Sequence, residues 1–283
     1  MNSSIYPCLW FAENAKTAAD FYCQVFSGEI SAESEVVVDI SLFGQKIMLL
    51  NGGPYFKKNA SVSFTIIAET EEEVELYWKQ LSENGIVLMP LDSYPWSKKY
   101  GWVKDQYDVT WQLYLGETIA EQKIVPTLMF LHENNGKAES AMELYTSIFL
   151  NSKIESILYY DENKAEEIEG NVQHAYFSIN DYAVFCMDSS YHHPFDFNEG
   201  ISLVVMTESQ EETNHLWDSL VADGGEESRC GWLKDKFGLS WQIVPKRLIQ
   251  LMHDKDREKA QKVVEAMMKM QKIDIDVLEN AFN

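Results

Sequence analysis

The chain repeats itself, and this duplication constrains the fold more than any other feature of the sequence. The segment YGWVKDQYDVTWQLYL, which begins at Tyr100, returns as CGWLKDKFGLSWQIVP from Cys230. Upstream, VSFTIIAETEEEVELYWKQLSENG from Val62 matches ISLVVMTESQEETNHLWDSLVADG from Ile201. A third match joins PCLWFAENAKTAADFYCQVF to PTLMFLHENNGKAESAMELYTSIF. Three matches in the same order predict two consecutive copies of one structural unit of about 120 residues.

The copies differ in length at one place. Val62 and Ile201 lie 139 positions apart, whereas Tyr100 and Cys230 lie 130 apart. We therefore expect a longer loop in the first copy, from Ile86 to Tyr100. The predicted domains are residues 1–118 and 124–247, joined near 118–123, and residues 248–283 form a helical tail.

Each copy predicts the element order βαβββ twice. A strand precedes an amphipathic helix, whose apolar residues fall on one face in both copies. Turn residues at 43–45 and 180–181 predict hairpins. Thr70 with Glu73, and Ser209 with Glu212, are capping boxes that predict the start of a second helix. The sequence therefore predicts an α+β protein.

Charge and composition exclude several classes of protein. The chain has 23 Lys and Arg against 45 Asp and Glu, a formal net charge of −22. Nucleic-acid binding and adhesion to an anionic membrane both need a basic surface, so neither partner is expected. No apolar run approaches the ~20 residues of a membrane helix, and no signal peptide is visible. We expect a cytoplasmic protein whose four cysteines are reduced thiols.

The motifs resemble those of one family. PCLWF, ADFYCQVF and the segment GWLKDKFGLSWQIVP are similar to those of PhnB-like proteins, and the tail segment KAQKVVEAMMKMQKIDI resembles their C-terminal extension. This family is labelled 3-demethylubiquinone-9 3-methyltransferase and belongs to the vicinal oxygen chelate superfamily, with glyoxalase I, bleomycin-resistance proteins and extradiol dioxygenases. The resemblance implies two tandem glyoxalase-like domains built from βαβββ units, and, by name, methyl transfer. A methyltransferase that uses S-adenosylmethionine normally carries a glycine-rich loop, and the sequence has no G-x-G-x-x-G.

The resemblance also implies where a divalent metal would bind. Superfamily enzymes use His and Glu from the first and last strands of paired units. Carried onto this chain, the last-strand positions fall on Gln112 and Gln242, and the first-strand positions fall near Pro7 and Pro126. The fifth-strand positions fall near Ser63 and Ser202, and one fourth-strand position near Asp188. Since this set lacks the expected His and Glu, we predict no metal ligands and no cofactor, and a metal retained at one equivalent would contradict this.

The remaining candidates each have a structural interpretation and a functional one. His174 is either a hydrogen-bonded strand residue or a general base. His192 lies in the aromatic segment SYHHPF, a candidate lid. The tryptophans at 102, 111, 232 and 241 recur with the duplication, so they either pack the core or line a ligand. The pairs Lys104–Asp105 and Lys234–Asp235 predict a turn with a local ion pair. The candidate ligand-binding set is Trp102, Trp111, Gln112, Asp188, His192, Trp232, Trp241 and Gln242.

The tail has an apolar stripe that includes Val263, Met267 and Met270. The stripe either packs on the body of the protein or forms a dimer contact, because Met adapts to irregular surfaces. We predict a homodimer with the tail at or near the contact, and we expect each copy to pair its own two βαβββ units. We also expect the second copy to hold the more open and more polar cup, because it carries His174 and Asp188.

These features favour the binding of a small apolar or aromatic molecule in a half-barrel cup, without a standard metal centre. Two alternatives stay open at this level. One is an enzyme, either a metal-dependent lyase, isomerase or dioxygenase, or the methyltransferase of the family label. The other is a non-catalytic scaffold whose cups are filled by aromatic side chains.

Overall fold

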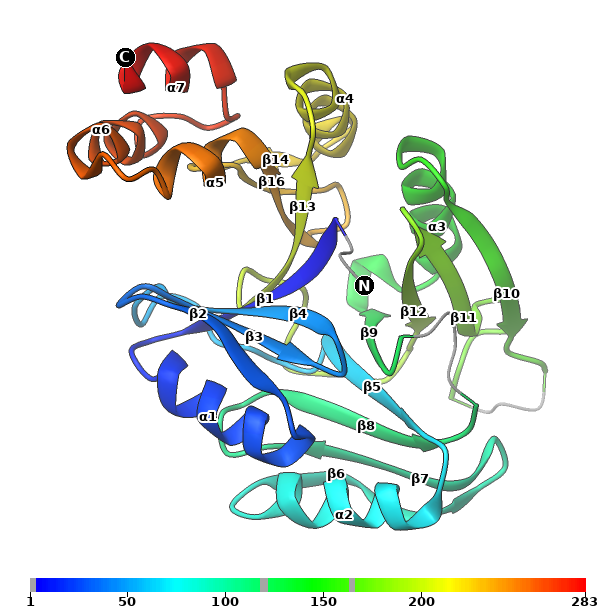
Figure 1. The fold of residues 1–283 in the computed structure, drawn as a ribbon. Helices are drawn as coiled ribbons and strands as arrows, with labels where there is room; N and C mark the ends of the chain where they lie inside the picture. The colour runs from blue at the N-terminus through cyan, green and yellow to red at the C-terminus, as the bar shows by residue number, and fades with distance from the viewer. Residues whose placement is uncertain (1–3, 118–121, 163–165) are drawn as a thin grey trace. The chain divides into compact units, whose positions relative to one another are not determined.

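The computed structural model describes residues 4–117, 122–162 and 166–283. The chain forms two compact units (Figure 1): one contains residues 7–201, and the other contains residues 4–6 and 202–283. Most of the predicted junction, residues 118–121, lies outside the described residues. The predicted α+β class is confirmed, since both units combine helices with sheets that contain antiparallel strand pairs.

The order βαβββ recurs as predicted, and we number the resulting modules one to four along the chain. Module one contains β1 (Ile5–Phe11), α1 (Ala15–Phe26), β2 (Glu29–Glu33), β3 (Val37–Leu42) and β4 (Gln45–Asn51). Module two contains β5 (Val62–Ala68), α2 (Glu71–Ser82), β6 (Ile86–Tyr94), β7 (Ser97–Lys104) and β8 (Thr110–Leu115). Module three contains β9 (Ile124–Phe130), the 3-10 turn η1 (His132–Asn134), α3 (Ala138–Ile148), β10 (Lys153–Tyr159), β11 (Val172–Ile179) and β12 (Tyr182–Asp188). Module four contains β13 (Ile201–Thr207), α4 (Gln210–Val221), β14 (Glu226–Glu227), β15 (Trp232–Lys234) and β16 (Ser240–Pro245).

Modules two and three share one sheet, with the strand order β10-β11-β12-β9-β5-β8-β7-β6. Their first strands, β5 and β9, lie antiparallel, with Phe64 opposite Pro126. The expectation that each copy pairs its own two modules is therefore wrong, because module two of the first copy pairs with module three of the second. The connection from Leu115 to Ile124 is short, so β9 lies beside β5 of the module that directly precedes it in the chain.

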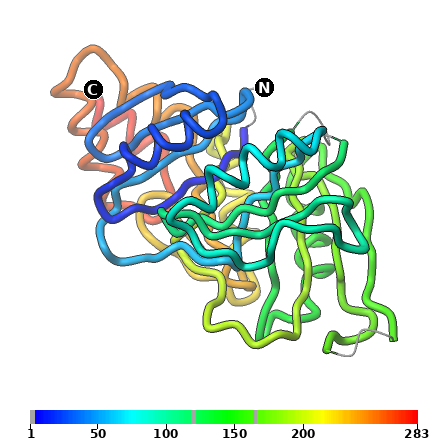
Figure 2. The backbone as a smooth tube through the Cα atoms, turned by 90° about the horizontal axis from the view of Figure 1, so that it is seen from below, coloured from blue at the N-terminus to red at the C-terminus, as the bar shows by residue number. Residues whose placement is uncertain are grey.

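Helices cover one face of this sheet. Figure 1 and Figure 2 show α2 running along the strands of its module, and the ring of Trp111 on β8 lies 5.2 Å from that of Phe26 on α1. On module three, Tyr145 of α3 stacks on Phe177 of β11 at 6.1 Å. Because successive side chains of a strand point to opposite faces, the neighbours of Trp111 and Phe177 point away from the helices. We call that opposite side the inner face.

Local sequence explains where the helices and hairpins form. Thr70 Oγ1 accepts a hydrogen bond from the N–H of Glu73 at 3.2 Å, and Ser209 Oγ accepts one from Glu212 at 3.2 Å. Both predicted caps are confirmed. The turn at Asn180 and Asp181 has positive φ at both residues (51° and 60°), as a two-residue hairpin of this twist requires.

The segment expected to be a longer loop in the first copy is instead a β-hairpin. β6 pairs with β7 from Ile86 to Tyr94 with three register shifts, and Tyr94 lies opposite Ser97 at the tip. The extra residues begin with Ile86 and Val87, whose β-branched side chains favour a strand. The equivalent strand of the second copy, β14, has two residues.

The tail contains α5 (Lys246–Met252), α6 (Arg257–Met267) and α7 (Ile275–Phe282). Val263 and Leu278 are fully buried, whereas Met268 is 58% exposed. The predicted homodimer stays a prediction, which sedimentation of the whole chain would test. All four cysteines are free thiols, as expected. Within the described ranges, none of the helices combines the length and apolar character needed to cross a bilayer.

Candidate functional site

Two sequence-predicted residues meet on the inner face of the sheet of modules two and three. Trp102 on β7 lies directly opposite Gln112 on β8. The hydroxyl of Tyr100 donates to Gln112 Oε1 at 2.8 Å, and Gln112 Nε2 donates to Ser63 Oγ at 2.8 Å. Both ends of the amide are thus fixed, and the residues form an uncharged hydrogen-bonded chain across three strands.

The inner face continues from this chain into an apolar floor. Thr65 on β5 and Thr127 on β9 share a hydrogen bond of 2.7 Å between their hydroxyls. Beside them lies a buried cluster against which the partly buried rings of Tyr114 and Tyr176 pack; its members are Ile67, Val125, Ala183 and Phe185. The centre of the face therefore offers apolar surface and neutral hydrogen-bonding groups, with aromatic rings on either side.

Trp102 brings a hydrogen-bond donor to this face. Its indole Nε1 is shielded from solvent and has no acceptor within the part of the chain that the structure describes. A buried N–H without an acceptor costs about 1–3 kcal/mol. The indole N–H is therefore a group that an acceptor atom of a bound molecule would satisfy.

The second unit repeats part of this arrangement. Trp232 lies opposite Gln242, and Gln242 Nε2 donates to Ser202 Oγ at 3.0 Å. The position of Tyr100 is taken by Cys230, whose Sγ lies 3.9 Å from Met268 Sδ in the tail. The Trp–Gln–Ser set thus recurs, but the tyrosine hydroxyl that holds the glutamine oxygen in module two has no equivalent at Cys230.

Trp111 and Trp241, which sequence grouped with the ligand-binding candidates, belong to the core. Both are 0% exposed. Trp111 Nε1 donates to Asp105 Oδ2 at 2.8 Å, and Trp241 Nε1 donates to Asp235 Oδ2 at 2.9 Å. A ring that is fully buried on the helix side cannot line a ligand site on the inner face, so their structural interpretation fits.

The contacts of Asp105 correct the predicted Lys104–Asp105 ion pair. Asp105 is buried and also accepts from the hydroxyl of Tyr22 and from the backbone N–H groups of Tyr107 and Val109, at 2.8–3.0 Å. Lys104 pairs with Asp108 instead, at 3.0 Å. Burial raises the pKa of Asp105, although its hydrogen-bond donors oppose that shift. The motif GWxKD therefore marks a buried turn whose carboxylate anchors a tryptophan.

Asp188 caps a helix and does not face a ligand. One carboxylate oxygen accepts from the N–H groups of Gly136 and Ala138, at 2.8 and 3.1 Å, where α3 begins. The other accepts from the N–H of Val172 at 2.9 Å. The side chain is 1% exposed. Its proposed ligand-binding role is corrected, because its two oxygens are occupied by backbone donors of module three.

The histidines do not join the Gln112 chain. His174 lies on β11, and β12, β9 and β5 separate this strand from β8. Its ring packs against Phe185 at 4.9 Å, and desolvation by the surrounding protein lowers its pKa. His192 is exposed in its loop, with its ring 5.8 Å from that of His132. His174 lies on the inner face but away from Gln112, and its role as a general base stays a prediction.

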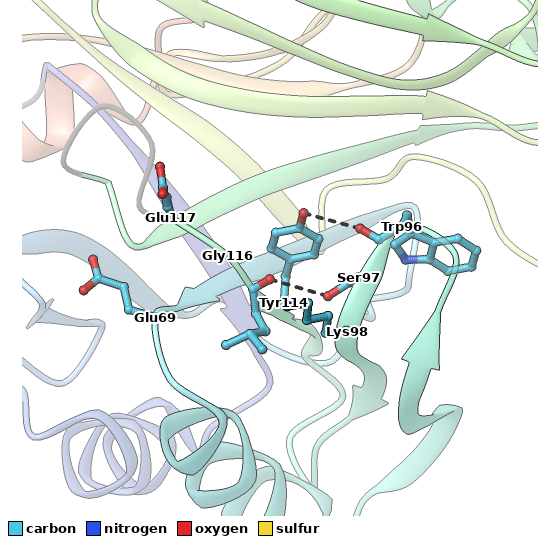
Figure 3. Close-up of a pocket in the computed structure, with 8 residues that line it drawn as sticks. Glu69, Trp96, Ser97, Lys98, Tyr114, Gly116 and Glu117 are labelled. Atoms are coloured by element: carbon cyan, nitrogen blue, oxygen red, sulfur yellow. Dashed lines mark hydrogen bonds between the residues drawn. The ribbon is translucent and has the colours of Figure 1, made fainter.

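A pocket of about 540 Å³ opens at the rim of the sheet, where β7 begins and β8 ends (Figure 3). Tyr114 links it to the inner face, because this ring lines the pocket and packs against the apolar floor. The lining residues are Glu69, Trp96, Ser97, Lys98, Tyr114, Leu115, Gly116 and Glu117.

The inner face does not offer the ligands of a vicinal oxygen chelate metal centre. Gln112, at the last-strand position, already uses its amide oxygen to accept from Tyr100. Its neighbour Ser63 brings a neutral hydroxyl, whereas a divalent ion favours imidazole and carboxylate ligands. Across residues 4–117, 122–162 and 166–283, no three His, Cys, Asp or Glu side chains are grouped to hold a metal ion.

Sequence reasoning missed Tyr100 and Thr65 entirely, and treated Ser63 only as a position that lacks histidine. One signal could have found Tyr100: it lies two residues before Trp102, so strand alternation places both on one face. Thr65 and Ser63 become neighbours of Gln112 only through the pairing of β5 with β8 and β9. The duplicated sequence contains no local pattern for that pairing.

Comparison with known proteins gives one family and one fold. A model of the family described as 3-demethylubiquinone-9 3-methyltransferase matches residues 3–114 and 122–244. The PhnB protein from Bacillus cereus is 34% identical, over 38% of this chain and 96% of its own, with a TM-score of 0.37. Glyoxalase I from Zea mays is 11% identical, over 85% of this chain and 91% of its own, with a TM-score of 0.59. None of the curated proteins matches the chain.

Proposed function

Because the chain belongs to the 3-demethylubiquinone-9 3-methyltransferase family, the PhnB-like branch of the glyoxalase fold, we propose that it binds a small molecule on the inner face of modules two and three. One observation carries this proposal: the chain Tyr100–Gln112–Ser63 fixes a neutral polar group beside Trp102, whose indole N–H has no acceptor among the described residues. The great majority of buried donors are paired within the protein, so an unpaired indole N–H on this face favours an acceptor from a bound molecule.

The chemistry of the face describes the ligand. The polar groups around Gln112 are hydroxyls, an amide and an indole, all of them neutral, and the neighbouring floor is apolar. A small apolar or aromatic molecule with one oxygen acceptor would bury its ring against the floor and accept from Trp102. Such sites are mostly apolar, with a few polar groups that fix orientation.

The methyl transfer in the family description is not part of this proposal. The sequence lacks the glycine-rich loop that normally holds S-adenosylmethionine. The β5–β12 sheet is mixed, with β5 antiparallel to β9, and differs from a doubly wound parallel sheet. We also propose no metal-dependent reaction, because the residues around Gln112 do not offer the ligands that a divalent metal favours.

The test uses the indole signal of Trp102 in a ¹H,¹⁵N NMR spectrum, assigned with Trp102→Phe. Three neutral probes that each carry an oxygen acceptor, 2-methoxyphenol, acetophenone and cyclohexanone, are titrated one at a time to millimolar concentration. At least one is expected to move the Trp102 signal, and Gln112→Met is expected to weaken that probe's binding about five-fold or more. Trp232 provides the matched control, since it occupies the same place in the second unit.

The proposal is wrong if none of the three probes moves the Trp102 signal. It is also wrong if the Trp102 and Trp232 signals move together to the same extent, because that pattern indicates binding without a site in module two. Gln112→Met keeps the length of the side chain, so the variant is expected to fold. A cooperative thermal unfolding transition verifies this.

A further inference from the structure

The hairpin that distinguishes the first copy carries an aromatic tip. Tyr94 ends β6, and Trp96 stacks on it with ring centroids 5.0 Å apart and an angle of 22° between the rings. The edge of Tyr100 meets both, at 5.7 and 5.8 Å. Since Tyr100 also holds Gln112, these rings lead from the hairpin tip to the hydrogen-bonded chain of the inner face.

The tip forms one wall of the rim pocket. Trp96 lines the pocket. Tyr94 covers one side of the Trp96 ring, and the residue remains 48% exposed. Opposite, the hydroxyl of Tyr114 donates to the backbone oxygen of Trp96 at 3.5 Å (Figure 3). The pocket volume of about 540 Å³ lies in the range of small-molecule sites. An aromatic ring entering here would contact both Trp96 and Tyr114.

The charges around the pocket favour one sign of ligand. Among the described residues that line the pocket, Glu69 and Glu117 carry carboxylates and Lys98 carries an ammonium group. The next lysine, Lys99, is already engaged by Glu71 and Glu75. With a net charge of −22 on the chain, the surrounding potential is negative, and it repels anions and attracts cations.

The N-terminus of α2 does not reverse this preference. Its exposed donors would favour an anion, but the hydroxyl of Thr70 accepts from the N–H of Glu73, and Glu73 Oε2 accepts from the N–H of Glu69 at 3.1 Å. Two of the donors at this helix start therefore already have partners within the helix cap.

From this arrangement, and on the premise of the proposed function, we infer that the hairpin tip sets ligand specificity. The rim pocket selects a planar aromatic compound without a negative charge, and it prefers one with a positive charge. Trp96 and Tyr114 contact the ring, and Glu69 and Glu117 favour the cation. Aromatic faces and carboxylates together are the usual chemistry of aromatic cation recognition.

The experiment compares three molecules with one ring and three charges: tryptamine, indole and indole-3-propionate. Each is titrated into the whole chain by isothermal titration calorimetry at 20 mM salt, and the NMR signal of Trp102 is followed in parallel. Tryptamine is expected to bind about three-fold or more tighter than indole, and indole-3-propionate about three-fold or more weaker, with both differences shrinking at 300 mM salt.

Two variants with matched controls locate the effect. Trp96→Leu is expected to weaken indole and tryptamine about five-fold or more, whereas Tyr55→Leu, at a site 78% exposed and outside the pocket, leaves both unchanged. Glu117→Gln is expected to remove most of the tryptamine preference and to leave indole unchanged. Its control is Glu72→Gln, an exposed glutamate that does not line the pocket.

The outcomes separate this inference from the proposed function. If Trp96→Leu binds indole as tightly as wild type does, or if indole-3-propionate binds as tightly as tryptamine, the inference is overturned. The proposed function still stands in that case if a probe with an oxygen acceptor moves the Trp102 signal. If none of the three binds, the inference is overturned whatever other molecules do on the inner face. The variants change surface side chains, and their melting temperatures verify that they fold.

Discussion

The strand pair β7–β8 in the first copy and the pair β15–β16 in the second share their fold residues and differ in the residues of the candidate site. Both have a buried aspartate that accepts from the tryptophan six residues later, and both place a Trp opposite a Gln that donates to a serine. Only the first pair extends into a hairpin with an aromatic tip, and only there does tyrosine precede the glycine of GWxKD. The duplicated residues thus build the strand pair, and the unique ones determine what its inner face can bind.

The two strand pairs share a buried turn, and this turn is the physical reason for their common fold. A carboxylate that accepts from an indole and from two backbone N–H groups fixes the turn and the tryptophan together. The tryptophan in turn fills the space between sheet and helices, and its full burial contributes about 3 kcal/mol or more. Such a turn tolerates little variation, whereas Trp96 at the hairpin tip is 48% exposed and contributes less to the core.

The largest expected effect concerns the two turns. Asp105→Ala and Asp235→Ala leave several buried donors without acceptors, so each is expected to lower the free energy of unfolding by about 3–5 kcal/mol. Urea unfolding followed by tryptophan fluorescence measures the loss. If one variant lowers the free energy of unfolding by less than about 1 kcal/mol, the two turns are not equivalent, which contradicts the prediction.

The helix caps of modules one and three give the next effect. Asp188 accepts from three backbone N–H groups, whereas Asn51, at the end of β4, accepts from the N–H of Ala15 at 2.9 Å. We expect Asp188→Ala to cost about 3 kcal/mol and Asn51→Ala about 1 kcal/mol. Equal losses in thermal or urea unfolding would show that the extra donors of Asp188 contribute nothing.

A half-buried lysine, Lys58, links the first turn to pH. Burial lowers the pKa of Lys58 to about 8, while Asp105 and Asp108 oppose the shift, and Nζ donates to the backbone oxygen of Trp10 at 2.6 Å. Between pH 8 and 10.5 the unfolded chain binds the lysine proton more than the folded chain does. The contribution of Lys58 to the free energy of unfolding therefore rises with pH across this window.

This rise is measured against Lys58→Met. The stability of wild type relative to the variant is expected to increase by about 1–3 kcal/mol between pH 8 and pH 10, as measured by urea unfolding at each pH. Taking the difference cancels groups that titrate in both proteins. The exposed neighbour Lys57, changed to Met, controls for the loss of one positive charge. A flat difference for Lys58→Met contradicts the prediction.

The smallest effect concerns the residue next to Gln112, which is Tyr100, and the equivalent position in the second copy, which is Cys230. Tyr100→Cys gives the first copy the residue of the second, and it removes the hydrogen bond to Gln112 Oε1. Tyr100→Phe removes the same bond with little change of volume, at an expected cost of about 1 kcal/mol. Both variants are expected to weaken the neutral probes at Trp102. The comparison fails if Cys230→Ala has the same effect on those probes as Tyr100→Cys.

Much of the fold could be predicted, because its signals are local. The caps at Thr70 and Ser209 and the turn at Asn180–Asp181 depend on residues within three positions of one another. The apolar faces of α1 and α3 follow from a repeat of 3.6 residues. For the candidate site, sequence identified Trp102 and Gln112 but wrongly grouped Trp111 and Asp188 with them, because residue type does not reveal which face of a strand is covered by a helix.

The sequence by itself determined the duplication, the four βαβββ modules and the α+β class, since these depend on order and periodicity along the chain, and its motifs resembled those of the family. The tertiary structure alone decided that module two pairs with module three, that the longer segment of the first copy is a hairpin, and that Gln112 meets Ser63 across 49 positions. Contacts of that range depend on which strand edges meet when the modules pack, and a strand's sequence specifies its faces far more strongly than its neighbours.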